Sequence, residues 1–316
     1  MDFVHTPVLL EETIRYLAPR SAGELMVDAT MGEGGHSYAF LSRFPDLELI
    51  GIDADGVIQD RAKERLGEFG SRVHFYTDWS QSFFAGYPAG LRRPDTILAD
   101  LGVSLFHYER SRRGFSFRKD EELDMRLDTS SGLSAAELLA RLPEKELADL
   151  LYNNAGERYS RRIARTIVER RRHGAVKSSA ALAELIEGAV PVSYRRRPMH
   201  PATKSFQALR AAVNGDLSRL PDLLEGALRI LKPGGRLGII SFNSLEDKII
   251  KNFFREKNRN CTCPPEEPIC KCKGRRSVNI LTRKGIVPGS AETEQNPRSR
   301  SARLRVAEKV LDEDGQ

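Results

Sequence analysis

The order of apolar and polar positions in the first 110 residues alternates between two spacings. Short apolar runs, which are typical of buried strands, occur at Leu25–Val27, Leu49–Ile52, Arg72–Tyr76 and Thr96–Ala99. Residues 9–17 and 57–66 instead place apolar side chains at the three- and four-residue intervals of a helix. Strands that alternate with helices are typical of a parallel sheet with crossover connections, so the pattern predicts an α/β fold.

The pattern changes near Ser111, where strand-like runs stop. We expect helices at Ser134–Ala140, Glu144–Leu151, Glu157–Arg172 and Ala180–Ala189. Strand patterns return at Arg236–Ser241 and at two closing segments that could pair antiparallel, Val278–Leu281 and Leu304–Ala307. The sequence therefore predicts a discontinuous sheet domain, residues 1–110 and 206–316, interrupted by an all-α domain at residues 111–205.

The segment after the first strand has the composition of a nucleotide-cofactor loop. Asp28 ends the strand, and a helix begins near His36. Between them, Gly32, Gly34 and Gly35 allow backbone amides to approach a ligand without a Cβ in the way. A purely structural glycine turn is the alternative interpretation.

Three cofactor classes can be compared with this loop. Enzymes that bind NAD usually carry G-x-G-x-x-G directly after the strand, whereas this loop reads D-A-T-x-G-x-G-G. A P-loop is excluded because no Lys-Ser or Lys-Thr pair follows the glycines. The Asp28 carboxylate is poorly placed to face a pyrophosphate but suits the cationic amino and sulfonium groups of S-adenosylmethionine, which we therefore expect as the cofactor.

Polar and aromatic residues fall at the ends of the predicted strands. Asp53 ends the second strand and can accept hydrogen bonds from both hydroxyls of a ribose. Trp79 and Asp100 follow the third and fourth strands. Because ligands of parallel sheets bind at the carboxyl ends of the strands, these residues are candidates for the same site as Asp28.

Length and composition limit the class of protein. The 316 residues suffice for an α/β domain with an insertion. No run of about eighteen apolar residues and no signal-type amino terminus occurs, so we expect a cytoplasmic protein without membrane association.

Basic residues are concentrated in the predicted helical domain. The net charge of the chain is +6, and residues 141–200 alone contain 13 Lys and Arg against 7 Asp and Glu, which also gives +6. Arginine runs occur at residues 170–172 and 195–197. Guanidinium groups bind phosphate and stack on bases, so this domain could hold nucleic acid, and a solvated arginine-rich surface is the alternative.

Four cysteines occur as two close pairs, Cys261 with Cys263 and Cys270 with Cys272. Four thiolates could bind zinc, although C-x-C is a less usual spacing than C-x-x-C. Reduced surface thiols, or a disulfide formed only on oxidation, are the alternatives. We predict that this cluster is separate from the chemistry and that the active site contains no metal.

Eight ordered segments resemble the RsmH (formerly MraW) family of bacterial 16S ribosomal RNA cytosine-N4 methyltransferases. They are DATMGEGGHS (28–37), DLGVS (100–104), RGFSF (113–117), LDMR (123–126), GERYSRRIARTIVERR (156–171), HPATKSFQALR (200–210), ISFNSLED (240–247) and NPRSRSARLRVAE (296–308). The resemblance extends over nearly the whole chain. It implies a Rossmann-like class I methyltransferase sheet with an inserted helical domain for RNA recognition. It also implies S-adenosylmethionine as the methyl donor and 16S rRNA of the small ribosomal subunit as the partner.

The resemblance also assigns cofactor-binding positions, which are Gly34, Gly35, His36, Asp53, Trp79, Asp100 and His107. Two of them depart from the family pattern, since Trp79 stands where Phe is common and His107 where Gln is common. Either aromatic ring can flank adenine, whereas imidazole cannot present the paired donor and acceptor of an amide. A third departure is Asn243, which replaces a common His and suggests positioning rather than proton acceptance.

The resemblance implies that the methyl acceptor is the exocyclic amine of a cytosine in the decoding centre. Asp100 is our candidate to accept hydrogen bonds from this amine, with Asn243 near it, and the alternative is that Asp100 only binds the cofactor. Two other functions stay open: a DNA amino-methyltransferase, and a non-catalytic RNA-binding assembly factor that retains S-adenosylmethionine. The sequence leaves open whether the substrate is free RNA or an assembled subunit, and whether the chain forms a homodimer.

Overall fold

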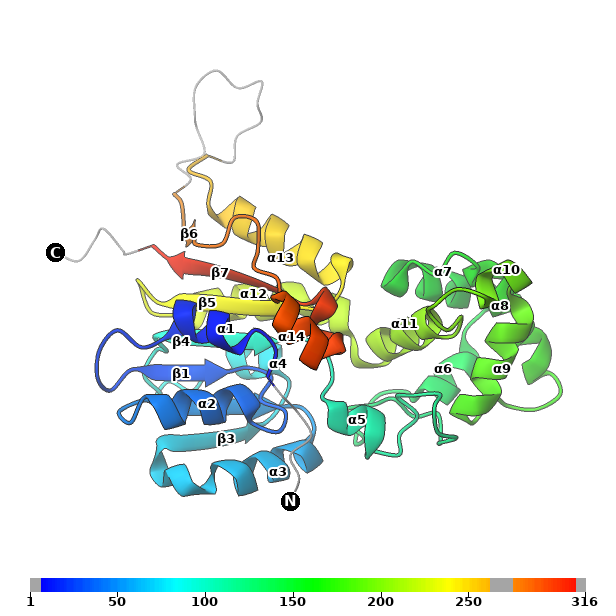
Figure 1. Cartoon of the computed structure of the whole chain (residues 1–316), viewed down its shortest axis with the longest axis horizontal. Coiled ribbons are helices and arrows are strands. Elements are labelled where there is room, and N and C mark those ends of the chain that lie inside the picture. Colours follow the sequence, from blue (N-terminus) through cyan, green and yellow to red (C-terminus); the bar gives the residue numbers. More distant parts are fainter. Residues whose placement is uncertain (1–6, 262–274, 311–316) are drawn as a thin grey trace. The chain divides into compact units, whose positions relative to one another are not determined.

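The computed structural model describes residues 7–261 and 275–310, and it contains a sheet of seven strands in the order β3-β2-β1-β4-β5-β7-β6 (Figure 1). The strands are β1 (Leu25–Asp28), β2 (Glu48–Asp53), β3 (Val73–Thr77), β4 (Thr96–Asp100), β5 (Arg236–Ser241), β6 (Val278–Ile280) and β7 (Arg303–Lys309). Strands β1 to β5 are parallel, and β7 is antiparallel to both β5 and β6. The predicted Rossmann-like α/β fold is confirmed.

The central strands are buried on both faces, which explains their continuous apolar runs. In β4, Ile97, Leu98 and Ala99 are fully buried, and they contribute alternately to two cores on opposite faces of the sheet. Strand β1 pairs with β2 on one side and with β4 on the other, so the strand order reverses between β1 and β4. Ligands of open α/β sheets bind beyond the carboxyl ends of the strands at such a reversal.

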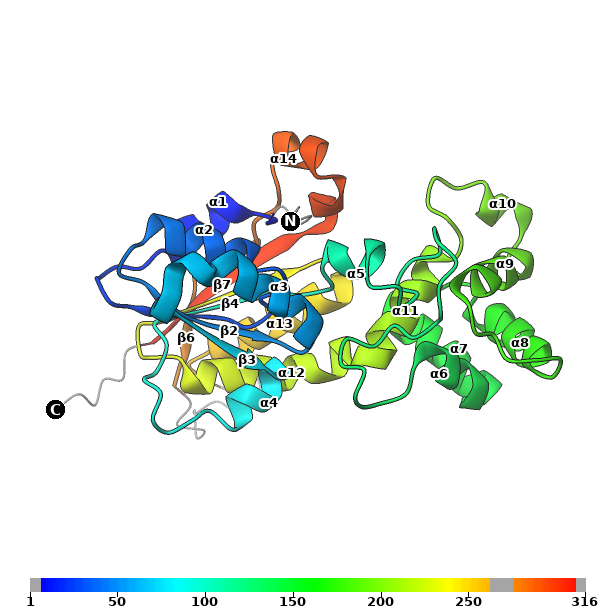
Figure 2. The ribbon, with the colours of Figure 1, turned by 90° about the horizontal axis from the view of Figure 1, so that it is seen from below.

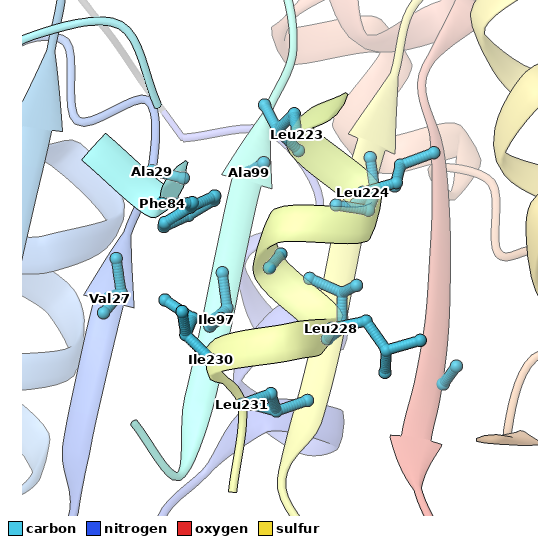
Figure 3. Close-up of a cluster of buried hydrophobic side chains, with 14 of the residues drawn as sticks. Val27, Ala29, Phe84, Ile97, Ala99, Leu223, Leu224, Leu228, Ile230 and Leu231 are labelled. Atoms are coloured by element: carbon cyan, nitrogen blue, oxygen red, sulfur yellow. The ribbon is translucent and has the colours of Figure 1, made fainter. Parts of the chain in front are cut away.

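Helices cover both faces of the sheet (Figure 2). One face carries α1 (Leu10–Leu17), α2 (Gly35–Arg43) and α3 (Gly56–Leu66), which share a core with Leu98. The other carries α4 (Ser80–Ala85), α12 (Asp216–Ile230) and α13 (Ser244–Lys257), which share a core with Ile97 and Ala99 (Figure 3). Three further short elements belong to the same part of the chain as the sheet: η1 (Gly67–Arg72), α14 (Ser290–Gln295) and η2 (Pro297–Ser301).

Residues 103–218 form a second, helical unit, and the rest of the chain belongs to the sheet unit. The helices of the second unit are α5 (Leu105–Glu109), α6 (Ala135–Arg141), α7 (Glu144–Ala155), α8 (Ser160–Arg171), α9 (Ser179–Ala189), α10 (Val192–Arg195) and α11 (Thr203–Asn214). A single hydrophobic core, which includes Leu147, Ile163 and Leu182, joins them.

The boundaries of the helical unit differ from the predicted residues 111–205. The unit begins at Val103 and ends at Ser218, so it includes α5 and all of α11. The reason is packing, since α11 contributes Phe206 and Leu209 to the helical core. An amphipathic pattern predicts that a helix has a buried face but not which domain covers it.

Three of the four cysteines, Cys263, Cys270 and Cys272, lie outside the described residues, so the zinc hypothesis stays a prediction. Within residues 7–261 and 275–310, no group of three or more His, Cys, Asp or Glu side chains could hold a metal ion. No helix in the described part of the chain is long and apolar enough to cross a membrane.

Candidate functional site

The glycine loop between β1 and α2 is tied to both strands that flank β1. The backbone N–H of Ala29 donates to the carbonyl of Leu98 in β4 at 2.8 Å. Two residues later, the backbone N–H of Met31 donates to the carbonyl of Ile52 in β2 at 2.9 Å. These two bonds hold the loop at the carboxyl edge of the sheet, where the strand order reverses.

Gly34 and Gly35 connect this loop to α2. Gly34 is the N-cap residue, with a φ of +73°, a left-handed conformation that favours glycine. A Cβ at Gly34 would also lie only 3.0 Å from Cδ1 of Leu66. Gly35 is the first residue of α2 and is buried. The loop therefore presents the amino end of α2 to the edge of the sheet, as an anionic or polar ligand group requires.

Asp53 is oriented by the backbone at the end of β2. Its Oδ2 accepts a hydrogen bond from the N–H of Gly32 at 2.8 Å, and its Oδ1 accepts one from the N–H of Asp55 at 2.9 Å. A carboxylate oxygen can accept more than one hydrogen bond, so both oxygens can still accept from ribose hydroxyls. The geometry suits the predicted role of Asp53.

Asp28 is a buried acid at the end of β1. Its Oδ2 accepts a hydrogen bond from Ser37 Oγ at 2.6 Å, and its Oδ1 accepts one from the N–H of Thr30 at 3.3 Å. Burial nevertheless raises the pKa of Asp28 to about 6, and the nearby Asp53 carboxylate adds to the rise. Ionised Asp28 is therefore destabilised unless a positive group approaches it.

Asp100 ends β4 as a buried carboxylate with an unused oxygen. Its backbone N–H donates to Thr30 Oγ1 at 2.6 Å. Among the described residues, no hydrogen-bond partner meets its buried Oδ1. Burial raises the pKa of Asp100 well above its ordinary value, and the carboxylates of Asp28 and Glu246 raise it further. A cation or a hydrogen-bond donor that reaches Oδ1 is therefore strongly favoured.

The imidazole of His36 lies between the backbone of Val8 and the carboxylate of Asp100. Its Nε2 lies 3.0 Å from the carbonyl oxygen of Val8, and its Nδ1 lies 3.8 Å from Oδ2 of Asp100. Because a carbonyl can only accept, Nε2 carries a proton and the neutral ring has its lone pair on Nδ1. The predicted cofactor residue His36 thus presents an acceptor nitrogen toward Asp100.

The start of α13 brings Asn243 and Glu246 to the edge of the sheet next to β4. Asn243 is the N-cap residue, and its Oδ1 accepts hydrogen bonds from the N–H groups of Leu245 at 3.0 Å and Glu246 at 2.9 Å. Glu246 is buried, and its Oε2 accepts a hydrogen bond from the N–H of Phe242 at 3.0 Å. The side-chain oxygen of Asn243 thus stabilises the helix start, which leaves its amide NH₂ for a ligand.

Glu246 was missed by the sequence analysis, which assigned it no role. A signal was present, because Asn at an N-cap followed three residues later by Glu is the pattern of a capping box. The pattern predicts a carboxylate at the helix start. It does not predict that this carboxylate is buried close enough to Asp100 to raise its pKa.

Trp79 is the N-cap residue of α4, two residues after the end of β3, and an arginine covers its indole. The guanidinium carbon of Arg219 lies 3.7 Å from the ring centroid. Contact at this distance holds the plane of the indole by a cation–π interaction. An indole has two faces, so Trp79 can stack on Arg219 with one face and on an adenine with the other.

His107 belongs to the helical unit, whereas the other predicted cofactor residues belong to the sheet unit. It lies in α5 and is buried, with its ring centroid 5.7 Å from that of Phe106 and 5.2 Å from that of Phe115. Its predicted contact with the cofactor stays a prediction.

The buried carboxylates fit a cationic ligand. Asp28 and Glu246 are almost fully buried, and the side chain of Asp100 is 13% exposed. Repulsion between these carboxylates costs free energy until a positive group neutralises it. S-adenosylmethionine carries a sulfonium and an ammonium group. Oδ1 of Asp100 can accept a hydrogen bond or face a positive charge, so the residues present fit this cofactor.

Comparison with known proteins identifies the family. A family model described as the MraW methylase family matches residues 2–310. A protein of Treponema denticola named "Ribosomal RNA small subunit methyltransferase H" is 54% identical over 310 residues, which is 98% of each chain. Proteins with the same name from Syntrophobacter fumaroxidans (46% identical, covering 96% of each chain) and Treponema pallidum (40% identical, covering 96% of this chain and 92% of that one) are also similar. The chain therefore belongs to the MraW methylase family and is an S-adenosylmethionine-dependent methyltransferase.

Proposed function

We propose that this methyltransferase modifies the N4 amine of a cytosine in the 16S rRNA of the small ribosomal subunit, in the cytoplasm. The names of its relatives and the eight family segments support the RNA substrate. The observation that carries the chemistry is the buried, unused Oδ1 of Asp100 at the carboxyl end of β4. A homodimer is compatible with this activity.

The cofactor is held by residues from four strand ends. S-adenosylmethionine, when bound, supplies a methyl group on a positively charged sulfur. In our proposal Asp53 binds the ribose hydroxyls, and Trp79 stacks on the adenine while Arg219 covers its other face. Asp28 and Asp100 face the positive groups, and Gly34 and Gly35 allow close backbone approach.

The target amine has a lone pair that is delocalised into the cytosine ring, so the enzyme must hold it in line with the methyl group and accept its hydrogen bonds. Oδ1 of Asp100 accepts the hydrogen bond of the amine and takes up the proton that leaves after transfer. Nδ1 of His36, 3.8 Å from Oδ2 of the same carboxylate, is the next proton acceptor. Asn243 positions the cytosine through its NH₂ group, which can donate to an acceptor atom of the ring and so leaves the lone pair of the amine for the methyl group.

The helical unit is proposed to bind the RNA. It contains 21 Lys and Arg against 15 Asp and Glu, a net charge of +6, whereas the rest of the chain balances at 29 of each sign. Phosphate contacts supply most of the sequence-independent affinity of proteins for nucleic acids. Charge alone therefore favours this unit over the sheet unit as the one that meets the RNA backbone.

Not every arginine of this unit is available for RNA. Arg195 donates to the carbonyls of Val190 at 3.1 Å and Gly188 at 3.3 Å, and so caps the end of α9. Arg196 and Arg197 are exposed, as Arg195 is, and the guanidinium carbon of Arg197 lies 5.0 Å from the centroid of the Tyr194 ring. The predicted arginine run at residues 195–197 is therefore better divided into one structural arginine and two candidates for RNA binding.

The proposal is tested by transfer of a tritiated methyl group to three acceptors: free 16S rRNA, assembled small subunits and duplex DNA. We expect incorporation into one or both ribosomal acceptors, with N4-methylcytosine as the product and S-adenosylhomocysteine formed in equal amount. Incorporation into duplex DNA alone would establish a DNA amino-methyltransferase. Tight cofactor binding without S-adenosylhomocysteine formation on any acceptor would establish a non-catalytic assembly factor.

A further inference from the structure

The exposed imidazole of His200 lies flat on the ring of Phe117 in the helical unit. We propose that the outer face of this imidazole is a stacking platform for an unpaired base of the RNA substrate. The inference rests on the proposed rRNA activity and adds a base-binding position to it. Both residues belong to family segments, RGFSF and HPATKSFQALR, to which the mechanism above gives no role.

The platform is built on the core of the helical unit. The ring centroids of Phe117 and His200 are 4.4 Å apart with an interplanar angle of 26°, which is a stacked arrangement. Phe117 in turn meets the buried Phe206 of α11 edge-on, at 5.1 Å and 75°. The outermost ring is therefore supported by two further rings, the last of which belongs to the core.

The orientation of the imidazole is also held by the backbone. Nδ1 of His200 accepts a hydrogen bond from the N–H of Ala202 at 3.2 Å, so in the neutral ring the proton is on Nε2. The ring thus offers a fixed plane and an N–H donor at its far edge. A planar ring that is ordered before binding loses little conformational entropy when a base stacks on it.

The surroundings suit a nucleic-acid strand rather than an apolar partner. His200 is exposed, and three exposed arginines lie close to the two rings in the sequence: Arg118 follows Phe117, and Arg196 and Arg197 precede His200 by four and three residues. Proteins that bind single-stranded nucleic acid combine such cations for the phosphates with aromatic rings for the bases. An unpaired RNA base is therefore the occupant that this combination of ring and charge favours.

A purely structural role for His200 has to be separated from base stacking, because its Nδ1 also supports the start of α11. His200→Asn keeps an acceptor close to the position of Nδ1 and removes the ring. His200→Phe keeps the ring and removes the acceptor. The matched control is His173→Ala, since His173 is an exposed histidine of the same unit, just after α8.

The experiment measures the KM for 16S rRNA. It also measures the fluorescence of 2-aminopurine in a series of small-subunit RNA segments, each with this base at a different unpaired position. We expect His200→Asn to raise the KM by about 5- to 150-fold and to abolish the fluorescence quenching that wild type gives at one position, as expected for the loss of one stacked base. His200→Phe should keep the quenching, and His173→Ala should leave both readouts unchanged. Thermal unfolding and S-adenosylhomocysteine affinity verify that each variant is folded.

Three results would overturn the platform. In the first, His200→Asn keeps its KM within twofold of wild type. In the second, His200→Phe loses RNA affinity and quenching as His200→Asn does, which would show that an aromatic ring at position 200 does not hold the base. In the third, the loss appears with assembled subunits but not with free RNA, which would identify a ribosomal protein as the occupant. All three leave the proposed activity intact, which fails only if wild type methylates no ribosomal acceptor.

Discussion

At the scale of single residues, burial decides what the acids of the site contribute. Asp28 and Asp100 end adjacent parallel strands, and both have a raised pKa because their carboxylates are removed from water. Such groups destabilise the cofactor-free fold when they ionise and favour a cationic ligand for the same reason. The site therefore stores unfavourable free energy that binding of a positive group releases.

The first prediction concerns stability and pH. The pKa of Asp28 is raised from 3.8 to about 6, so the folded state binds the proton of this carboxyl more tightly than the unfolded state does. The resulting stabilisation is fully present below pH 3.8 and is lost as the pH rises through about 6. This rise corresponds to about 3 kcal/mol of unfolding free energy. We expect wild type to lose up to about that much more stability than Asp28→Asn between pH 4 and pH 7.5 in urea titrations. If the unfolding free energies of the two proteins changed in parallel with pH, the prediction would be wrong. The control is Asp46→Asn, because Asp46 is exposed.

The second prediction separates chemistry from binding at Asp100. Asp100→Asn should lower the single-turnover rate by about 10²-fold or more at saturating cofactor and RNA, because the amide cannot take up the proton of the amine. Cofactor affinity is measured separately by calorimetry. An Asp100→Asn enzyme at full speed under saturation would show that this carboxylate only binds S-adenosylmethionine and that positioning, worth about 7–11 kcal/mol, is sufficient.

At the scale of elements, the first residues of two helices position side chains and backbone groups of the candidate site. Helix α2 begins at the glycine loop, and α13 begins at Asn243, whose side chain caps it. At the start of α6, Ser134 and Glu137 form a capping box, so side-chain caps occur at helix starts in both units. In α13, the cap also places Glu246 near Asp100.

The third prediction distinguishes the two possible roles of Asn243. Asn243→Ala should lower the unfolding free energy by about 1 kcal/mol, whereas Asn243→Asp keeps the cap and should preserve it. We expect both to lower the single-turnover rate less than Asp100→Asn does. Ser134→Ala, which removes a cap in the helical unit, should cost similar stability without changing the rate. An Asn243→Asp enzyme that is stable but as slow as Asp100→Asn would instead assign an essential contact to the Asn243 amide NH₂.

At the scale of the whole molecule, the two units divide the charge. The sheet unit is neutral by residue count and the helical unit carries +6, so a polyanion is attracted mainly to the helical unit. In our proposal the activity requires both units, because the candidate methyl-donor site lies in the sheet unit and the RNA is bound by the helical unit. RNA affinity and cofactor affinity should therefore respond to different substitutions.

The fourth prediction uses this separation. Replacing Arg196 and Arg197 by Ala should weaken RNA binding and reduce the slope of log K against log salt by up to about 1.4, while cofactor affinity stays unchanged. The control replaces Lys145 and Lys177, two exposed cations of the same unit, and should change the slope less. Equal slopes in the two double variants would show that Arg196 and Arg197 act only through net charge. Arg195→Ala should instead lower stability, because it removes a cap of α9.

The sequence alone determined the strands of the parallel sheet and several of the candidate residues at their carboxyl ends. Buried parallel strands require continuous apolar runs, and strand-ending acids must lie at the carboxyl edge, so Asp53 and Asp100 could be placed from the pattern. Helix caps such as Ser134 are equally local, since donor and acceptor lie three residues apart. The glycine loop and Asp28 already predicted the cofactor, and family resemblance added the reaction.

Only the tertiary structure decided the features that join distant parts of the chain. Glu246 raises the pKa of Asp100, and His200 stacks on Phe117, although neither pair is close in sequence. Packing likewise assigned α11 to the helical unit and gave Arg195 a structural role that its sequence did not distinguish from that of Arg196. A linear pattern reports which side chains are buried or charged. It does not report which distant groups share the same enclosed volume, and that proximity sets pKa values, hydrogen bonds and ring stacking.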